Sequence, residues 1–260
     1  MMNKNTLEGL LEQLEPSIEQ LIKSTSALAV KSKKVKKLVE VGNLKDLKPA
    51  TEELKSLLNS VTIFLNEFSD DAEFDSKDYL QSGLYATELL EVAKAKQLLL
   101  NIDNESLQCY PSIIQILPSD EAILIDKVKS KSLRPSHLIN SLKLKSGLTV
   151  KFRGEPFIEA LKNAYDYVIS NKKANQGSIV KLSDIYRVLT ILPASKSYSK
   201  TEFSRDLYLL EMNKITTTKS NHHMKLHSSA SSKSGTIFQT VTKGGQILTY
   251  ASISFGDKND

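Results

Sequence analysis

The sequence has too few cysteines for the disulfides that stabilise many secreted proteins. Its 260 residues include one cysteine, Cys109, and no tryptophan. A lone cysteine cannot form an internal disulfide, so the composition favours a reducing compartment. No apolar run approaches the roughly 20 residues that span a bilayer, and the first residues do not have the pattern of a secretory signal. We therefore expect a cytoplasmic protein without a membrane partner.

Arginine is also scarce, with 4 residues against 31 lysines. Arginine commonly recognises guanine by donating two hydrogen bonds to the edge of the base, whereas lysine acts as a point charge. If the protein binds DNA, we expect contacts mainly to the backbone and low sequence specificity.

Charge is distributed unevenly along the chain. The net charge, counted as Lys and Arg residues less Asp and Glu residues, is 10 − 8, or +2, in residues 1–60. It is 3 − 10, or −7, in residues 61–110. The same difference is 22 − 12, or +10, in residues 111–260. A basic C-terminal half is typical of a surface that binds phosphates, although lysine-rich surfaces also serve solubility.

Motifs of catalysis are missing from the sequence. It contains no GxxxxGK, GxGxxG, GxSxG or HExxH, and each of these marks a common phosphate, nucleophile or metal site. Cys109 lies in an apolar run, which predicts a buried structural thiol. We therefore predict a protein that is not an enzyme, with no catalytic residues and no cofactor.

Two clusters of potential metal ligands also fail the spacing rules. Residues 69–78 are acidic, but they lack the central glycine and final glutamate of a calcium loop. His222, His223 and His227 have no cysteine near them in sequence, so we expect a solvated loop and no zinc site.

The N-terminal part has two helical apolar stripes, and they predict a helical hairpin. Pro16 interrupts the first stripe, in residues 6–29, and predicts a kink or a helix start. Residues 31–37 (KSKKVKK) are interpreted as a solvated helical face, a nucleic-acid contact or a contact with an acidic partner. Pro49 suits the first turn of the second helix, which should end near Phe68.

The stripes look too irregular for a long coiled coil, but their apolar surface predicts self-association or binding of a larger protein partner.

The middle of the chain changes from helical to extended patterning. A helix is predicted over residues 84–100. Residues 107–117 and 122–128 are rich in Ile, Leu and Val and predict a β-hairpin with a four-residue turn. Pro111 predicts an edge position or a later strand start. A short helix is expected over residues 136–144.

The C-terminal part predicts three helices followed by a β-hairpin. The helices are expected near residues 156–168, 183–189 and 199–214. Two β-rich strands, 236–241 and 246–255, flank a Lys-Gly-Gly turn suited to a tight hairpin.

The third of these helices has the clearest signals. Ser199 and Glu202 have capping-box spacing, and Phe203, Leu207 and Leu210 form one apolar stripe. Residues off that stripe are predicted to form an outer, DNA-facing surface. The candidate nucleic-acid-binding residues are Lys200, Thr201, Ser204, Arg205 and Tyr208, together with Lys219 and Lys243.

In this element order, residues 156–255 resemble the winged helix-turn-helix superfamily. The resemblance implies that the third helix docks in the major groove and that the hairpin contacts an adjacent groove or the backbone. The chain departs from the pattern at residues 215–235, an insertion longer than a simple wing needs. Its portion 229–235 has the composition of a flexible segment.

Together these patterns predict a mainly α (α+β) fold in three parts. These are a helical assembly region (1–105), a β-hairpin plus short helix unit (106–150) and a winged-helix-like domain (151–260). The expected function is that of a non-enzymatic DNA-binding subunit with low sequence specificity. The alternative is a protein–protein adaptor in a multi-subunit machine that acts on DNA, for example in chromosome organisation or anti-phage defence.

Overall fold

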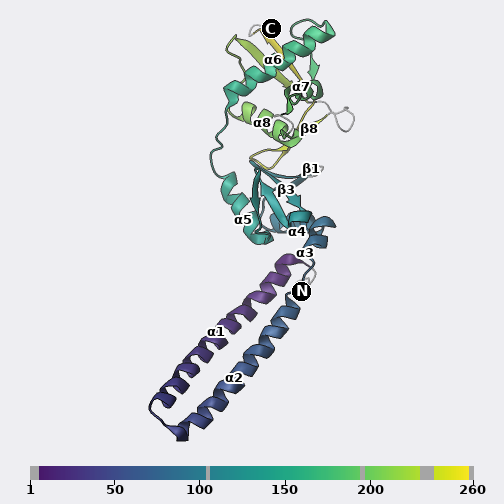
Figure 1. Ribbon diagram of the computed structural model, residues 1–260. Helices are drawn as coiled ribbons and strands as arrows, with labels where there is room; N and C mark the ends of the chain where they lie inside the picture. Colours follow the sequence, from purple (N-terminus) through teal and green to yellow (C-terminus); the bar gives the residue numbers. More distant parts are fainter. Residues whose placement is uncertain (1–5, 104–105, 194–196, 229–236, 258–260) are drawn as a thin grey trace. The chain divides into compact units, whose positions relative to one another are not determined.

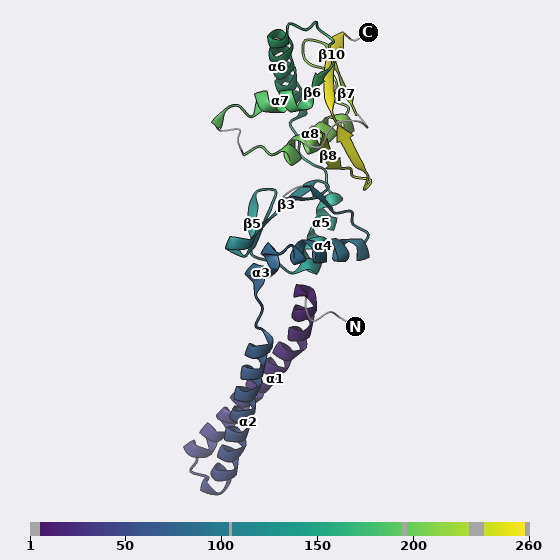
Figure 2. The same cartoon turned by 90° about the vertical axis from the view of Figure 1, so that its right-hand side faces the viewer.

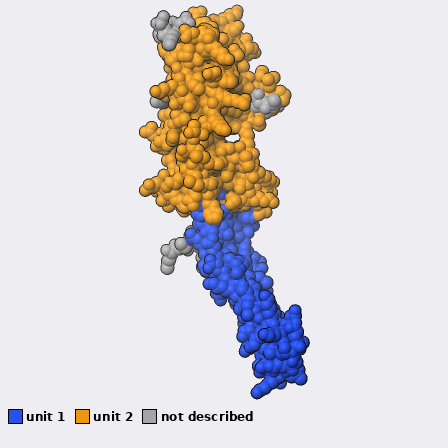
Figure 3. Space-filling view, turned by 90° about the vertical axis from the view of Figure 1, so that its left-hand side faces the viewer, with its two compact units in different colours: residues 1–88, 134–136 blue, residues 89–133, 137–260 orange. Residues whose placement is uncertain are grey.

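The computed structural model describes residues 6–103, 106–193, 197–228 and 237–257. The fold is α+β and mainly helical, as predicted: a long helical hairpin, then an antiparallel sheet, then helices with small sheets (Figure 1). Contacts divide the chain into two compact units, residues 1–88 with 134–136 and residues 89–133 with 137–260 (Figure 3). The predicted domain boundaries at 105 and 150 stay predictions, because compactness does not measure independent folding.

The first unit is dominated by the predicted helical hairpin. Helices α1 and α2 contain 34 and 28 residues and lie side by side in both views (Figures 1 and 2). Two shorter helices follow, and the boundary between the units falls within the second of them. The bounds are α1 Leu7–Glu40, α2 Leu44–Asp71, α3 Ser76–Gln81 and α4 Leu84–Ala95.

The hairpin is longer and more regular than the sequence patterns predicted. Pro16 lies inside α1, which begins after the N-cap Thr6, and Pro49 lies inside α2, which begins after the N-cap Asn43. The predicted helix start near Pro16 and the predicted first-turn position of Pro49 were therefore wrong, and a kink at Pro16 stays a prediction. A proline removes one backbone hydrogen bond, and both helices nevertheless continue past it.

The seam between the two helices has the spacing of a coiled coil. The less exposed positions of α1 and α2 recur at alternating intervals of three and four residues, as in a heptad repeat. These seam residues are Leu14, Ser17, Leu21, Ser24, Leu28, Lys31, Val35 and Leu38 on α1, and Leu47, Ala50, Leu54, Leu57, Val61, Phe64 and Phe68 on α2. Our interpretation of the stripes as too irregular for a long coiled coil is corrected.

The second unit begins with a five-stranded antiparallel sheet in the order β1-β2-β3-β4-β5. The predicted hairpin is confirmed as β3 and β4, which pair around a short 3-10 turn, η1. The sheet is larger than predicted because each apolar run forms two strands. The first run divides at Tyr110–Pro111 into β2 and β3, and the second divides at Asp126 and Lys127, which both have positive φ, into β4 and β5. The bounds are β1 Asn101–Asp103, β2 Ser106–Cys109, β3 Ser112–Leu117, η1 Pro118–Asp120, β4 Ala122–Ile125 and β5 Val128–Ser130.

Helices and two small sheets form the rest of this unit. The predicted helices are present, and β8 pairs with β9 as the predicted C-terminal hairpin. The second predicted strand divides at Ala251, after which β10 pairs with β6 and β7 instead. The bounds are α5 Pro135–Ser146, α6 Gly154–Lys172, β6 Val180–Lys181, α7 Leu182–Leu189, α8 Lys200–Met212, β7 His222–His227, β8 Phe238–Val241, β9 Ile247–Tyr250 and β10 Ser252–Asp257.

The core of this region is built around aromatic side chains. Tyr165 from α6, Phe203 from α8 and Phe255 from β10 are fully buried in one cluster. The rings of Phe203 and Phe238 meet edge to face with centroids 4.9 Å apart, a geometry that stabilises aromatic pairs. Phe203 therefore joins α8 to the β8–β9 hairpin.

The expected flexibility of residues 229–235 lies outside the described residues. None of the helices in the described ranges combines the length and apolar character needed to cross a bilayer.

Candidate functional site

The N-terminus of α8 is fixed by the predicted capping box. The backbone N–H of Glu202 donates to Ser199 Oγ at 3.1 Å, and the Ser199 N–H donates to Glu202 Oε2 at 2.8 Å. Two of the unpaired donors at the start of the helix are satisfied in this way.

The apolar face of α8 is also as predicted. Phe203, Leu207 and Leu210 each have no exposed surface and belong to the core of the C-terminal region. This face anchors the helix.

The predicted outer face of α8 is largely covered, which corrects the sequence interpretation. Thr201 and Ser204 are buried, with 7% and 1% of their surface exposed. Thr201 Oγ1 lies 3.1 Å from the hydroxyl of Ser106 on β2. Ser204 Oγ donates to the carbonyl of Gln239 on β8 at 2.7 Å. These two residues are not available to a DNA groove in this arrangement, because strands β2 and β8 occupy that side of the helix.

Arg205 and Tyr208 are half-buried and make contacts within the protein. The Arg205 guanidinium donates to Asp206 Oδ1 at 3.1 Å and lies 3.9 Å from Asp126. Tyr208 Oη accepts the backbone N–H of Lys243 at 3.0 Å, and its ring meets Tyr110 edge to face. The two side chains therefore link α8 to its neighbours.

The three predicted lysines remain at the surface. Lys200, Lys219 and Lys243 are exposed. The backbone N–H of Lys219 donates to Glu159 at 2.6 Å, which fixes the backbone there. Of the predicted nucleic-acid-binding residues, the lysines are the ones that keep a fully exposed position.

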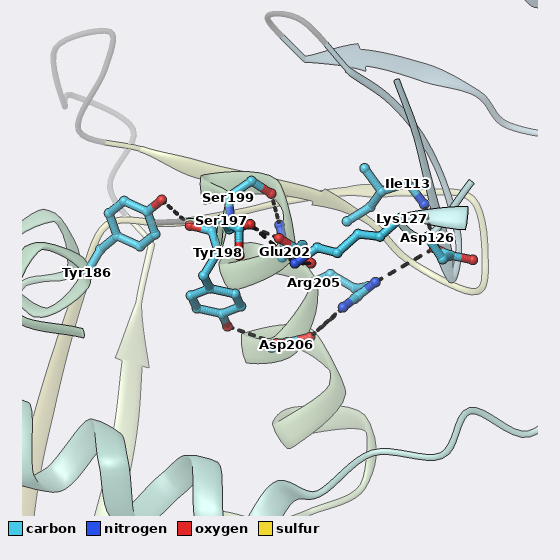
Figure 4. Close-up of polar contacts among 10 residues, drawn as sticks. All are labelled: Ile113, Asp126, Lys127, Tyr186, Ser197, Tyr198, Ser199, Glu202, Arg205 and Asp206. Atoms are coloured by element: carbon cyan, nitrogen blue, oxygen red, sulfur yellow. Dashed lines mark hydrogen bonds and ion pairs between the residues drawn. The ribbon is translucent and has the colours of Figure 1, made fainter. Parts of the chain in front are cut away.

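A pocket of about 450 Å³ lies beside the N-terminal turns of α8. Its charged groups are paired within the protein: Lys127 Nζ lies 2.9 Å from Glu202 and donates to the carbonyl of Ser197, and Arg205 lies between Asp126 and Asp206 (Figure 4). The charges that line the pocket thus neutralise one another, so it resembles a structural junction more than a charged ligand site.

A hydrogen-bonded pair of half-buried acidic groups, Tyr198 and Asp206, lies beside this pocket. Tyr198 Oη donates to Asp206 Oδ2 at 2.8 Å. Burial raises the pKa of Asp206 even though Arg205 and Tyr198 favour its ionised form, and burial together with Asp206 raises the pKa of Tyr198. These two groups hold the α7–α8 connection against α8.

The other candidate ligands lie elsewhere. His222, His223 and His227 lie on β7, not in the solvated loop that we predicted, because residues 222–227 pair with β10. His227 Nε2 is 2.9 Å from Ser254 Oγ. No group of three or more candidate metal ligands occurs within the described ranges. Cys109 is buried, as predicted.

The hairpin presents a second candidate surface, which lies beside the coiled-coil seam. In the heptad defined by the seam, the e positions of both helices flank it on one side and the g positions flank it on the other. The e positions contain no charged residue, and we call them the uncharged flank. They are Leu11, Ile18, Thr25, Ser32 and Val39 on α1, and Leu44, Thr51, Leu58 and Leu65 on α2.

The uncharged flank is apolar and exposed. Its large aliphatic side chains other than Leu11 keep between 37% (Ile18) and 76% (Leu44) of their surface exposed. Solvent-facing helices usually carry charges at these positions, so a run of exposed aliphatic residues indicates an interaction surface.

The opposite side of the seam is different. We call its g positions the charged flank, because half of them are charged. They are Gln13, Gln20, Ala27, Lys34, Asp46, Glu53, Ser60 and Glu67. On this side Glu53 also forms an ion pair of 2.5 Å with Lys31 of the seam. The contrast between the flanks is a property of the hairpin itself.

Hydrogen bonds hold the open end of the hairpin in place. The carboxylate of Glu88 accepts the backbone N–H groups of Leu7 and Glu8 and the hydroxyl of Tyr79. Glu8 in turn accepts from Arg134, whose side chain also pairs with Glu15. A carboxylate at the start of α1 stabilises its N-terminus, so the first turns of the helix are anchored.

Comparisons of the chain with protein-family models, with curated proteins and with solved structures find no match.

The uncharged flank was missed at the sequence level. Its signal was present, since aliphatic and hydroxyl residues recur every seven positions from Leu11 to Val39. Recognising it requires the seam first, and the seam of α1 contains Ser17, Ser24 and Lys31. These polar residues interrupt the apolar pattern by which a heptad repeat is recognised in a sequence.

Proposed function

We propose that this protein is a non-enzymatic adaptor that binds protein through the uncharged flank of its α1–α2 hairpin. The observation that carries the proposal is the contrast between the two sides of one coiled coil. The e positions on one side bear exposed aliphatic residues and no charge, and the g positions on the other side bear acidic residues and a lysine. Helical partners commonly bind such apolar helical surfaces.

The hairpin suits this role because its shape is set before binding. The seam holds the two helices together, and the Glu88 and Glu8 contacts hold the start of α1. A surface that is ordered in advance loses less conformational entropy when a partner binds.

Duplex DNA is the alternative partner, and the buried side of α8 counts against the predicted mode of binding. A recognition helix needs an accessible face, whereas Thr201 and Ser204 pack against β2 and β8. Of the residues predicted to bind DNA, the exposed Lys200, Lys219 and Lys243 are the ones that could still contact it. The winged-helix resemblance remains compatible with an adaptor, since the fold does not fix the function.

A salt titration separates the two partners. If lysines bind phosphates, the logarithm of the affinity for duplex DNA should fall with the logarithm of salt concentration, by about 0.9 for each phosphate contact. The adaptor proposal expects no binding of this kind at physiological salt.

The adaptor proposal is tested with a variant that adds charge to the flank. Leu58→Glu with Leu65→Glu places two acidic groups on the uncharged flank. The matched control, Gln20→Glu with Ser60→Glu, adds the same charge to the charged flank. We expect a protein, either another chain or an untagged copy of this one, to co-purify with the wild type and the control but not with the flank variant. In purified form, this protein should bind the wild type again and should not bind the flank variant. Equal retention of every bound protein by the flank variant would contradict the proposal.

A further inference from the structure

We infer that the partner of the uncharged flank is the same flank of a second copy of this chain. The two hairpins would pack face to face as a four-helix bundle. This inference depends on the proposed function and specifies the partner for it.

The hydroxyl residues of the flank are already satisfied within their own helices. Thr25 Oγ1 donates to the carbonyl of Leu21 at 2.9 Å, and Ser32 Oγ donates to that of Leu28 at 2.9 Å. Thr51 Oγ1 donates to the carbonyl of Leu47 at 2.8 Å. These three are all the polar residues of the flank, so covering it would leave no side-chain hydrogen bond unmade.

The lack of charge also suits a symmetric partner. In a two-fold dimer each surface meets an identical surface, and like charges placed opposite each other destabilise the contact. The charged flank carries Asp46, Glu53 and Glu67 against the single lysine Lys34, so packing it against its own copy would bring an excess of acidic groups together. The uncharged flank avoids this repulsion.

Side-chain size varies along the flank in a way that suits pairing with itself. Val39 and Leu44 lie on either side of the hairpin connection, and Ile18 and Leu65 lie toward the opposite end. Thr25, Ser32 and Thr51 lie between them, together with Leu58. Pairing by a two-fold axis would bring the aliphatic ends together and let the helices approach closely near Ser32 and Thr51.

The available area is sufficient for a stable dimer. A helix of 28 residues, the length of α2, is about 42 Å long, and two adjacent helices are roughly 20 Å wide. The side of the hairpin that carries the uncharged flank therefore covers on the order of 800 Å² on each copy, which is the size of a standard stable interface.

The test measures self-association of the full chain over a dilution series by sedimentation velocity and light scattering. We expect the wild type and the Gln20→Glu, Ser60→Glu control to dimerise. We expect the Leu58→Glu, Leu65→Glu variant to have a dissociation constant raised at least about 100-fold, because four acidic groups would meet in its interface. A second variant, Thr25→Lys with Thr51→Lys, should have the same effect with the opposite charge. Circular dichroism verifies that each variant keeps its helices.

Each of the other results overturns the inference. A dimer that survives both flank variants uses another surface. A wild-type chain that stays monomeric when concentrated has no second copy on its flank. If that monomer still binds another purified protein through the flank, the adaptor function survives without the dimer. If it binds none, both proposals fail.

Discussion

The hydroxyl of Ser204 donates a hydrogen bond to the backbone carbonyl of Gln239 at 2.7 Å, and 1% of Ser204 is exposed. Ser204 lies one turn before Leu207, beside the apolar stripe of α8, at a position where the sequence predicted solvent or DNA. Together with the 3.1 Å contact between Thr201 and Ser106, the bond shows that α8 packs against strands β2 and β8 as well as against the aromatic core.

The first prediction concerns this burial. Ser204→Lys should lower the free energy of unfolding by at least about 3 kcal/mol, because it buries a charge without a partner. Lys200→Ser, at an exposed position one turn away, should change it by less than about 0.5 kcal/mol. Urea unfolding followed by circular dichroism measures both. An unchanged midpoint for Ser204→Lys would mean that this side of α8 is open.

The second prediction concerns Cys109. Burial, with a smaller contribution from Asp126, raises the pKa of the Cys109 thiol from 9.0 to about 11. Two units reduce the thiolate fraction at pH 8 about 100-fold, and the thiolate is the reactive form. Iodoacetamide should therefore label the denatured chain at least that much faster than the native one. Equal labelling rates would contradict the buried position.

Sequence patterns predicted the elements of the fold better than their packing. The Ser199–Glu202 capping box and the Phe203 stripe were predictable because both depend on local spacing and on apolar residues. The burial of Thr201 and Ser204 was not, because small polar side chains give no apolar signal. They pack against backbone carbonyls and hydroxyls that come from distant parts of the chain, such as Ser106 and Gln239.

The same reasoning applies to the hairpin. Its existence followed from leucine periodicity, but its length did not, because prolines usually end helices and here α1 and α2 continue through them. The polar seam residues Ser17, Ser24 and Lys31 concealed the heptad. The uncharged flank can be recognised only after the seam is assigned.

The third prediction concerns Lys31, which occupies a seam position. Its ion pair with Glu53 is partly exposed, and such pairs contribute little to stability, whereas an apolar side chain at a seam position is buried. Lys31→Leu should raise the unfolding free energy of the hairpin by about 1 kcal/mol. Lys34→Leu, on the exposed charged flank, should leave it nearly unchanged. Thermal unfolding that shows equal effects for both changes would contradict the seam assignment.

The fourth prediction concerns pH. Burial raises the pKa of Glu8, but hydrogen bonds from Ser136 and Arg134 outweigh it and leave the pKa below its ordinary value of 4.5. A carboxylate with a lowered folded pKa stabilises the folded state above its unfolded pKa, and this contribution is lost as the pH falls through the folded pKa. The wild type should therefore exceed Glu8→Gln in stability at neutral pH, and the difference should shrink below about pH 4.5. Glu19→Gln, an exposed change on the same helix, is the control. A difference that is independent of pH would show that Glu8 acts without its charge.

The most direct test of the account is hydroxyl-radical footprinting of the full chain in dilute and in concentrated solution, with mass spectrometry of each peptide. We predict that Leu58 and Leu65 are oxidised in dilute protein and protected in concentrated protein, because a second copy covers the uncharged flank. We predict that Phe203 and Leu207 are protected in both, because α8 is packed within one chain. Equal oxidation of Leu58 and Leu65 at both concentrations, with α8 open to oxidation, would contradict the account.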